Sequence, residues 1–278
     1  MSDNYVISDF GHGYGGLGNQ LSRLAAVLEY KNKHNKKAIF INLNKNEHER
    51  YIITNEGYNI FFNNKLNTIT KNEFDNLKFN MYYENNDKNY ELPYIHGNVY
   101  LNGYFINFKY ISDNTRDEIN SLIYNNNIFH SNALNYYNNI KLHFKDDNDD
   151  NYIFIHIRLG DLVIEHNFKN IDMNFYKNSL NELYKDNKNN KHIIIFSEDI
   201  EWCKNNINFD NDSIYYIDNL NNHYTEFILM SLIQNGIIGY SYCSSYTHIS
   251  SFSLWAGYIG HKNKNIIIQD AHKDFLKK

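Results

Sequence analysis

The sequence predicts an α/β protein made of two halves, each built on a parallel sheet that helices cover. Three observations predict this class. Short runs of branched apolar residues alternate with helical stretches in the second half, a glycine-rich loop joins an early strand to a helix, and a short charged segment separates the two regions. Such alternation is typical of βαβ units. A chain of 278 residues also has room for about two ordinary domains, each with its own core.

The first half opens with a predicted strand at residues 5–10, followed by the loop GHGYGGLGNQ. Apolar residues then recur at helical spacing to about residue 32, and a buried strand is predicted at 38–43. The region 45–89 is rich in Asn and weakly patterned, so it predicts no defined element. A strand at 99–105 and a mostly helical stretch at 115–144 complete this half.

The segment KDDNDDN at 145–151 is short, charged and without periodicity, which is typical of a linker. We therefore predict domains at 1–148 and 149–278. Beyond the linker, strands are predicted at 152–157, 192–196, 213–217, 237–239 and 265–268, and helices near 172–187, 200–206, 224–235 and 250–260. Because α/β sheets bind ligands at the carboxyl ends of their strands, two such halves facing one another would hold a ligand between them.

Composition excludes several classes of protein. The net charge is −5, from 27 basic and 32 acidic residues, so no positive field suggests a nucleic-acid partner. Two cysteines, Cys203 and Cys243, make neither a metal cluster nor a disulfide framework, which fits a reducing compartment. The start of the chain lacks the pattern of a signal peptide, and no window approaches the roughly 20 apolar residues of a membrane span. We therefore expect a soluble cytoplasmic protein.

Gly11, Gly13 and Gly16 fit the G-x-G-x-x-G fingerprint of dinucleotide-binding loops. An NAD site also needs a carboxylate at the end of the next strand, but Glu47 is the first one to follow it. The predicted helix also begins nearer Gly18 than Gly13. NAD binding is therefore disfavoured. A plain glycine turn and a site for another diphosphate both stay open, because backbone N–H groups at a helix N-terminus bind anions of many kinds.

Two further segments place anion-binding groups at strand-to-helix junctions. In IFIHIRLGD, alternation puts His156 and Arg158 on one face at the carboxyl end of a strand, and an arginine can bind a phosphate through two charge-assisted hydrogen bonds. The alternative is that Arg158 pairs with Asp161 while His156 is satisfied in the core. In Ser250–Trp255, hydroxyls and free N–H groups at a helix start make either an anion site or a simple cap.

The segment GGLGNQ at 15–20 resembles the opening motif of the GDP-fucose-dependent α-1,2-fucosyltransferases, glycosyltransferase family 11. Other segments resemble that family's motifs in the same order: LNGYF at 101–105, HIRLGD at 156–161, FSEDIEWC at 196–203, LMS at 229–231 and SSFS at 250–253. The resemblance implies a GT-B-like fold, in which two Rossmann-like domains face a central cleft. The N-terminal domain would take the acceptor and the C-terminal domain the nucleotide sugar.

The resemblance further implies an inverting transfer of fucose from GDP-fucose to the 2-hydroxyl of a galactoside in a glycan or glycolipid, with no cofactor and no metal. The donor-binding residues that it implies are Gly16, Gly18, Asn19, Gln20, His156, Arg158, Glu198, Asp199, Ser250, Ser251 and Phe252. Arg158 and His156 would contact the diphosphate, Asn19 would reach toward the sugar, and Glu198 and Asp199 would lie near the nucleoside. Carboxylates suit guanine, because its N1–H and its amino group are hydrogen-bond donors.

Inverting transfer needs a base for the acceptor hydroxyl and stabilisation of the departing diphosphate. Arg158 and the backbone amides of Ser250–Phe252 are expected to meet the second need, and His156 is a further catalytic candidate at the diphosphate. The candidates for the base are Asp161 first, and then Asn19, Glu226 and His12. Asp147-Asn148-Asp149 formally reads as D-x-D, the metal motif of many glycosyltransferases, but it lies in the charged segment before a strand and is interpreted as a solvated loop.

Three departures from the family pattern leave alternatives open. Leu159 stands where the family has a second arginine, residues 239–246 lengthen the approach to SSFS, and Leu254–Gly257 replaces W-W-G-A. The alternative functions are a related transferase with another nucleotide-sugar donor and a carbohydrate-binding protein without turnover.

Animal members of the family carry a membrane anchor, and this chain shows none. We therefore expect a bacterial-type or viral protein. Peripheral membrane contact and the oligomeric state are left open.

Overall fold

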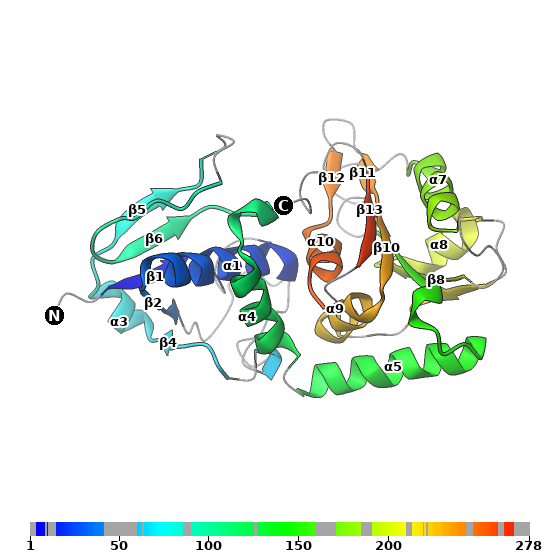
Figure 1. The fold of residues 1–278 in the computed structure, drawn as a ribbon, viewed down its shortest axis with the longest axis horizontal. Helices are drawn as coiled ribbons and strands as arrows, with labels where there is room; N and C mark the ends of the chain where they lie inside the picture. Colours follow the sequence, from blue (N-terminus) through cyan, green and yellow to red (C-terminus); the bar gives the residue numbers. More distant parts are fainter. Residues whose placement is uncertain are drawn as a thin grey trace. The chain divides into compact units, whose positions relative to one another are not determined.

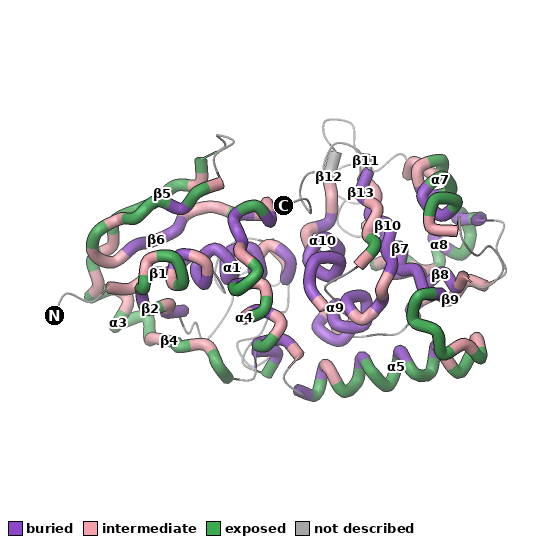
Figure 2. Tube along the Cα trace, viewed as in Figure 1, coloured by how far each residue is buried: buried purple, intermediate pink, exposed green. Residues whose placement is uncertain are grey.

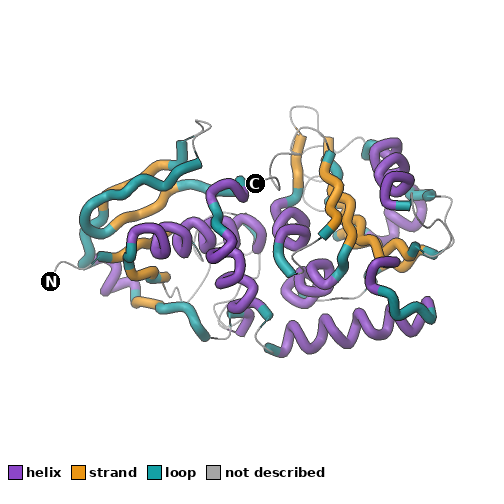
Figure 3. Tube along the Cα trace, viewed as in Figure 1, coloured by secondary structure: helices purple, strands orange, loops and turns teal. Residues whose placement is uncertain are grey.

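The computed structural model describes residues 4–8, 10, 15–41, 60–62, 64–85, 90–124, 127–159, 171–184, 191–209, 213–218, 220, 222–242, 247–260 and 264–269. The chain divides into two compact units between Ile128 and Phe129, and each is described by itself. Each unit contains a parallel sheet flanked by helices, so the predicted α/β class is confirmed (Figure 1, Figure 3).

The first unit is built on a four-stranded parallel sheet in the order β2-β1-β6-β5. Its strands are β1 (Tyr5–Ser8), β2 (Lys37–Ala38), β5 (Asn80–Tyr83) and β6 (Val99–Asn102), and β3 (Phe40–Ile41) pairs separately with β4 (Thr68–Ile69). Its helices are α1 (Leu17–His34), α3 (Lys71–Asp75), the 3₁₀ turn η1 (Phe108–Tyr110) and α4 (Asp113–Ile123). After β1 the chain adds β2 on one side of β1. The later strands β5 and β6 lie on the other side, with β6 next to β1. The switch point of this sheet therefore lies between β1 and β6.

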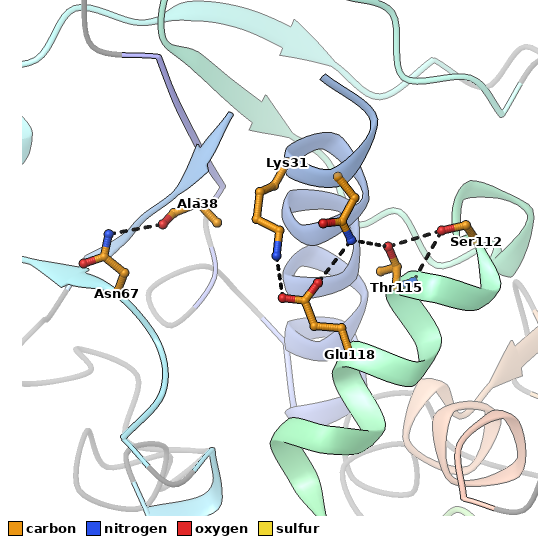
Figure 4. A network of polar contacts seen from close by, with 7 residues as sticks. Lys31, Ala38, Asn67, Ser112, Thr115 and Glu118 are labelled. Carbon is orange, nitrogen blue, oxygen red and sulfur yellow. Dashed lines mark hydrogen bonds and ion pairs between the residues drawn. The ribbon is translucent and has the colours of Figure 1, made fainter. Parts of the chain in front are cut away.

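Helix α1 forms because Leu17, Leu21, Leu24 and Leu28 repeat at helical spacing and are all buried. A polar network fixes its last turns against α4 (Figure 4). Lys31 Nζ lies 2.5 Å from Glu118 Oε1, and the Asn32 amide donates to Glu118 and to Thr115, each at 3.1 Å. Ser112 accepts the Thr115 N–H and so caps the start of α4. This network orients α4 across the side of α1.

The second unit is built on a five-stranded parallel sheet in the order β13-β10-β7-β8-β9. Its strands are β7 (Tyr152–Ile157), β8 (His192–Ser197), β9 (Ile214–Tyr216), β10 (Asn235–Ile238) and β13 (Asn265–Ile268). Its helices are α5 (Ile128–Phe144), η2 (Asp149–Asn151), α7 (Met173–Leu183), α8 (Ile200–Asn206), α9 (His223–Leu232) and α10 (Ser251–Tyr258). An antiparallel hairpin of β11 (Tyr240–Tyr242) and β12 (Thr247–Ile249), which the sequence did not predict, precedes α10.

From β7 the chain proceeds outward to β8 and β9, and then returns to β10 on the other side of β7. The switch point of this sheet is therefore the carboxyl ends of β7 and β10. Helices α7 and α8 cover one face, while α9 and α10 cover the other and are buried along most of their length (Figure 1, Figure 2). The two helical layers make the sheet a buried one, as its continuous apolar strands predicted.

Strand β7 is buried throughout, and its side chains alternate between the two faces. Ile153, Ile155 and Ile157 join the apolar cluster beneath α7 and α8. Phe154 and His156 take the other face. A Cβ added at Gly236 on β10 would lie 2.2 Å from the Phe154 ring, so glycine is required where the neighbouring strand carries this ring.

The stretch predicted to be helical at 115–144 is two helices, and α5 packs with the second unit. The Tyr137 ring lies 5.6 Å from Tyr152, and Phe144 stacks on His192 at 4.1 Å. The segment predicted as a linker is tied to the same unit, because Asp146 accepts a hydrogen bond from the Asn151 amide and lies 3.0 Å from His192 Nε2. The predicted boundary at residue 148 thus differs from the division of the compact units at Ile128.

Lys264 joins the ends of α9 and α10. Its ammonium group donates to the Ser231 carbonyl at 2.5 Å and to the Ala256 carbonyl at 2.8 Å, near the C-termini of the two helices. Positive charge there also opposes the negative end of each helix dipole.

Replacing Lys264 with methionine is expected to lower the free energy of unfolding by about 1–3 kcal/mol, because charge-assisted bonds to two helix-end carbonyls are lost while the apolar stem is kept. Urea denaturation measures this change. Lys204, whose ammonium pairs with the exposed Glu201, provides the control. Its methionine variant is expected to change stability much less than the Lys264 variant does, and an equal effect in both variants would contradict the role assigned to Lys264.

Candidate functional site

Two buried polar atoms lie at the switch point of the second sheet without a hydrogen-bond partner among the described residues. They are Nδ1 of His156, at the end of β7, and Oγ of Ser250, immediately before α10. Both residues are 5% exposed, and the His156 ring lies 5.9 Å from that of Phe252, two residues after Ser250. Buried polar atoms are nearly always paired. Two such atoms at the position where α/β sheets bind ligands indicate a site completed by the ligand.

The start of α10 adds further donors. Ser250 is the N-cap residue of this helix, yet its side chain makes no capping bond. The backbone N–H groups in the first turn of a helix have no acceptor within the helix, and the positive end of the helix dipole favours an anion there. Ser251 and Phe252 in this turn are half-buried. Phe252 packs edge to face on Phe227 of α9 at 5.3 Å, which fixes the position of the turn.

Arg158 follows β7 directly and is half-buried. The pKa of His156 is lowered from 6.5 to about 4, mainly by burial; the charge of Glu198 opposes this shift, and the charge of Arg158 adds to it. The imidazole is therefore neutral at pH 7, and the positive charge at the end of β7 is carried by Arg158. Arg158 is also the only arginine after Arg116 in the sequence.

Leu159, where the family pattern has a second arginine, belongs to the core. It is 1% exposed and joins the apolar cluster that contains Ile157, Tyr176 and Leu180. Its N–H donates to Glu198 Oε2 at 3.0 Å. The side chain thus fills the face beneath α7, whereas His156 lies on the face of α10. The segment Leu254–Gly257, which replaces W-W-G-A of the family pattern, also belongs to the core, because Leu254 and Trp255 are buried within α10.

A cavity of about 400 Å³, called here the acidic pocket, opens at the carboxyl ends of β8 and β9. Its lining residues are Ser197, Glu198, Asp199, Ile200, Glu201, Ile217, Asp218, Leu220 and Glu226. The Asp199 carboxylate accepts the Trp202 N–H at 2.9 Å and caps α8. Burial, reinforced by the charge of Glu198, raises the pKa of Glu226 to about 8. Glu226 is therefore mostly protonated at pH 7 and can donate a hydrogen bond.

In the first unit, the GGLGNQ loop has a local structural explanation. Gly15 adopts a φ of +108°, and a Cβ added there would lie 2.3 Å from the Asn19 amide nitrogen. The Gln20 side chain is buried and donates to the Gly15 carbonyl at 3.2 Å, while Gly16 is the N-cap of α1. Gly18 is buried in the first turn of the helix. Gln20 thus shapes the loop, and Asn19 is the half-buried polar side chain beside it.

Some predicted residues cannot be placed, and the predicted D-x-D triplet lies away from the switch point. Asp161, His12, Gly11 and Gly13 lie outside the described residues. The D-x-D triplet precedes β7, at the amino edge of the sheet, and Asp149 bonds to the Tyr137 hydroxyl at 2.9 Å. Within the described ranges, no three His, Cys, Asp or Glu side chains are grouped to hold a metal ion. No helix in that part of the chain is long and apolar enough to cross a bilayer.

Sequence reasoning missed Glu201 and Asp218 of the acidic pocket and proposed Glu226 only as an alternative base. One signal was present for Asp218, since it follows the predicted strand at 213–217 directly and so stands at the carboxyl edge. Glu201 and Glu226 give no such signal, because they lie on helices. The structure brings Glu198, Asp199 and Glu226 together, and separately gathers His156, Ser250 and Phe252.

Comparison with solved structures shows the same fold in fucosyltransferases. Fucosyltransferase NodZ from Bradyrhizobium matches with a TM-score of 0.57 at 10% identity, over 98% of both chains. The structure of NodZ α-1,6-fucosyltransferase soaked with GDP-fucose matches with a TM-score of 0.53 at 10% identity, over 91% of both chains. The predicted fold class, an α/β fold with two parallel sheets of the GT-B kind, is therefore confirmed.

A search of curated proteins finds no significant match. In contrast, the family model described as glycosyl transferase family 11 matches residues 14–278, nearly the whole chain. That range contains the six motifs from which the family was predicted, and it includes every strand of the second sheet. The chain belongs to glycosyl transferase family 11 and is a glycosyltransferase.

Proposed function

We propose that this protein transfers fucose, with inversion, from GDP-fucose to the 2-hydroxyl of a galactoside and needs no metal ion. One observation carries the proposal: the unpartnered His156 Nδ1 and Ser250 Oγ lie at the switch point of the second sheet, and Glu198 of the acidic pocket accepts the Leu159 N–H just beyond the same strand. An anion-binding position and a carboxylate-lined cavity side by side match the two ends of a nucleoside diphosphate.

The diphosphate fits the switch point on electrostatic grounds. The Arg158 guanidinium, the N–H groups that start α10 and the Ser250 hydroxyl are all donors. The neutral His156 ring has one N–H to donate as well. As the sugar–phosphate bond breaks, charge builds up on the diphosphate, and fixed donors in a water-poor site stabilise that charge. The acidic pocket would repel phosphates, so the nucleoside must be the end that enters it.

Guanine fits the acidic pocket better than other common bases. Its N1–H and amino group present two adjacent donors, which one carboxylate such as Glu198 or Asp218 can accept together. Its O6 needs a donor, and the protonated Glu226 carboxyl can supply one. Uracil offers a single N–H between two carbonyls and would face carboxylates with acceptors. The NodZ structure soaked with GDP-fucose, which shares this fold, supports the same donor.

The acceptor position rests on the motif resemblance and not on the fold, because NodZ is an α-1,6-fucosyltransferase with the same fold. In the proposed reaction, the acceptor oxygen bonds to the anomeric carbon of fucose as the bond from that carbon to the diphosphate oxygen breaks. The acceptor proton passes to the base, for which Asp161 is the first candidate. Arg158 and the donors at α10 hold the GDP that leaves.

Nucleotide binding tests the donor directly. GDP at about 100 times its Kd is expected to stabilise the protein by about 2.7 kcal/mol, measured as a thermal shift, whereas UDP, dTDP and NAD should give little shift. Glu198→Gln is expected to weaken GDP binding, and Glu182→Gln, at an exposed position on α7, is the control. A UDP or dTDP response would indicate another donor. No nucleotide response, and no transfer or hydrolysis of GDP-fucose, would contradict the proposal, as would activity lost with EDTA and restored by Mn²⁺.

A further inference from the structure

We propose that Tyr104, in the first unit, is the platform on which the acceptor sugar stacks. This inference rests on the proposed function, in which a glycan accepts the transferred sugar. Tyr104 belongs to the turn of residues 103–105, called here the Tyr104 turn, which follows β6 directly. Tyr104 is 42% exposed although its side chain is large and aromatic.

The position of the turn points to a ligand. The switch point of the first sheet lies between β1 and β6, and the Tyr104 turn leaves the carboxyl end of β6 there (Figure 1). The chain after β1 leads to the Gly15–Gln20 loop at the start of α1. Crevices at the carboxyl ends of such strands are where open α/β sheets bind ligands. An exposed aromatic ring at this edge is therefore placed for contact with a bound molecule.

The turn is held in one conformation. Glu84 Oε2 accepts the N–H of Tyr104 at 2.7 Å and that of Phe105 at 2.9 Å. Gly103 packs so close to Glu84 that an added Cβ would lie 2.4 Å from the glutamate Cβ. Phe105 is 1% exposed and adopts a φ of +52°, a left-handed conformation that large residues seldom take. A strained turn fixed from both sides is typical of a preorganised binding element.

The Tyr104 ring is also fixed from one face. The Arg23 guanidinium lies 4.6 Å from the ring centroid, and Arg23 Nε donates to the Gly103 carbonyl at 3.3 Å. Arg23 is only 4% exposed, so the cation–π contact is made on the inner side of the ring. The outer face and edge of the ring are therefore the parts left for a ligand. That leaves a flat apolar surface in a set orientation, with a phenolic hydroxyl at its rim.

A pyranose ring suits this surface. Sugars present a face of C–H groups that can lie on an aromatic ring, and their hydroxyls can bond to the phenol at its edge. Two polar atoms near the ring, Glu84 Oε2 and Arg23 Nε, make hydrogen bonds to backbone groups of the turn. Their role is therefore to hold the turn in place. A neutral glycan fits the remaining apolar surface better than the charged nucleotide does. The geometry therefore assigns the acceptor, and not the donor, to Tyr104.

The test compares Tyr104→Ala with Tyr104→Phe. Loss of the ring is expected to raise the KM for a β-galactoside acceptor about tenfold, with the KM for GDP-fucose and the affinity for GDP unchanged. The phenylalanine variant keeps the stacking surface and should stay within about threefold of wild type. Tyr94→Ala is the matched control, because Tyr94 is 58% exposed and lies 5.2 Å from the Lys36 ammonium, next to the amino end of β2.

A binding measurement keeps the test independent of turnover. Saturation-transfer NMR is performed with methyl glycosides of galactose, glucose, mannose, N-acetylglucosamine and fucose, on protein saturated with GDP. The expected result is transfer from the protein to at least one glycoside, lost in Tyr104→Ala and kept in Tyr94→Ala. Binding of none of them by the wild type, an unchanged acceptor KM in Tyr104→Ala, or a raised KM for the donor alone would overturn the inference. Failure of GDP to bind the wild type would instead count against the proposed function.

Discussion

Replacing Arg158 with alanine is expected to lower the rate of transfer by a factor of about 10²–10³ and to leave the protein folded. Arg158 is half-buried, acts electrostatically on His156, and is the permanent cation at the end of β7. In the proposed reaction, negative charge grows on the diphosphate as fucose leaves. Losing the cation therefore raises the barrier more than it weakens the binding of the intact donor.

Steady-state kinetics with GDP-fucose, together with thermal unfolding of the same samples, measure this effect. Arg158→Lys keeps the charge without the planar fork, so its activity should fall between those of the wild type and the alanine variant. Lys177→Ala, at an exposed position on α7, is the control for loss of a positive charge from the same unit. Near-normal turnover by Arg158→Ala would remove this residue from the proposed mechanism.

Acidification is expected to destabilise the protein through His156. Burial lowers the pKa of this residue from 6.5 to about 4, so the unfolded chain binds its proton more readily than the folded one does. The stabilisation is complete above pH 6.5 and is lost as the pH falls toward 4, by about 3 kcal/mol in free energy of unfolding.

Urea denaturation at several pH values tests this prediction. Other groups titrate over the same range, so the informative quantity is the difference between the wild type and His156→Asn. The free energy of unfolding of the wild type should fall more steeply with decreasing pH than that of His156→Asn, because only the wild type has a buried imidazole that becomes protonated. The difference in stability between the two proteins should therefore narrow. His143→Asn, at an exposed position on α5, is the control for loss of a histidine from the same unit. Parallel curves for the wild type and His156→Asn would show that the imidazole is not held neutral.

The second sheet was largely predictable because its strands carry their own signal. The strands at 152–157 and 265–268 match β7 and β13 in full, since buried parallel strands read as continuous runs of branched apolar residues. Strand β5 lacks this signal: it is NMYY, an edge strand with mostly exposed side chains. Helix α3 carries a sequence signal at its start, because Thr70 and Glu73 form a capping box. The helix is too short, however, to show helical periodicity.

The site divides in the same way. His156 and Arg158 were predictable because they end a recognisable strand, and their neighbours in sequence remain their neighbours in space. The acidic pocket was not predictable from the sequence. Glu198, Asp218 and Glu226 come from two strand ends and a helix, and only the order of the strands in the sheet brings them together. The Tyr104 turn illustrates a third case. The LNGYF motif was recognised, but its contact with Arg23 and its left-handed Phe105 depend on packing that no local pattern encodes.

The buried setting of Leu159 restricts the side chains that this position can hold. An arginine introduced there would have to place a guanidinium among Ile157, Tyr176 and Leu180, where an uncompensated charge costs several kcal/mol. A second cation therefore cannot be added at position 159 by one substitution without a loss of stability. A gain in positive charge at this strand end is coupled to repacking of the core beneath α7, so several substitutions would have to be made together.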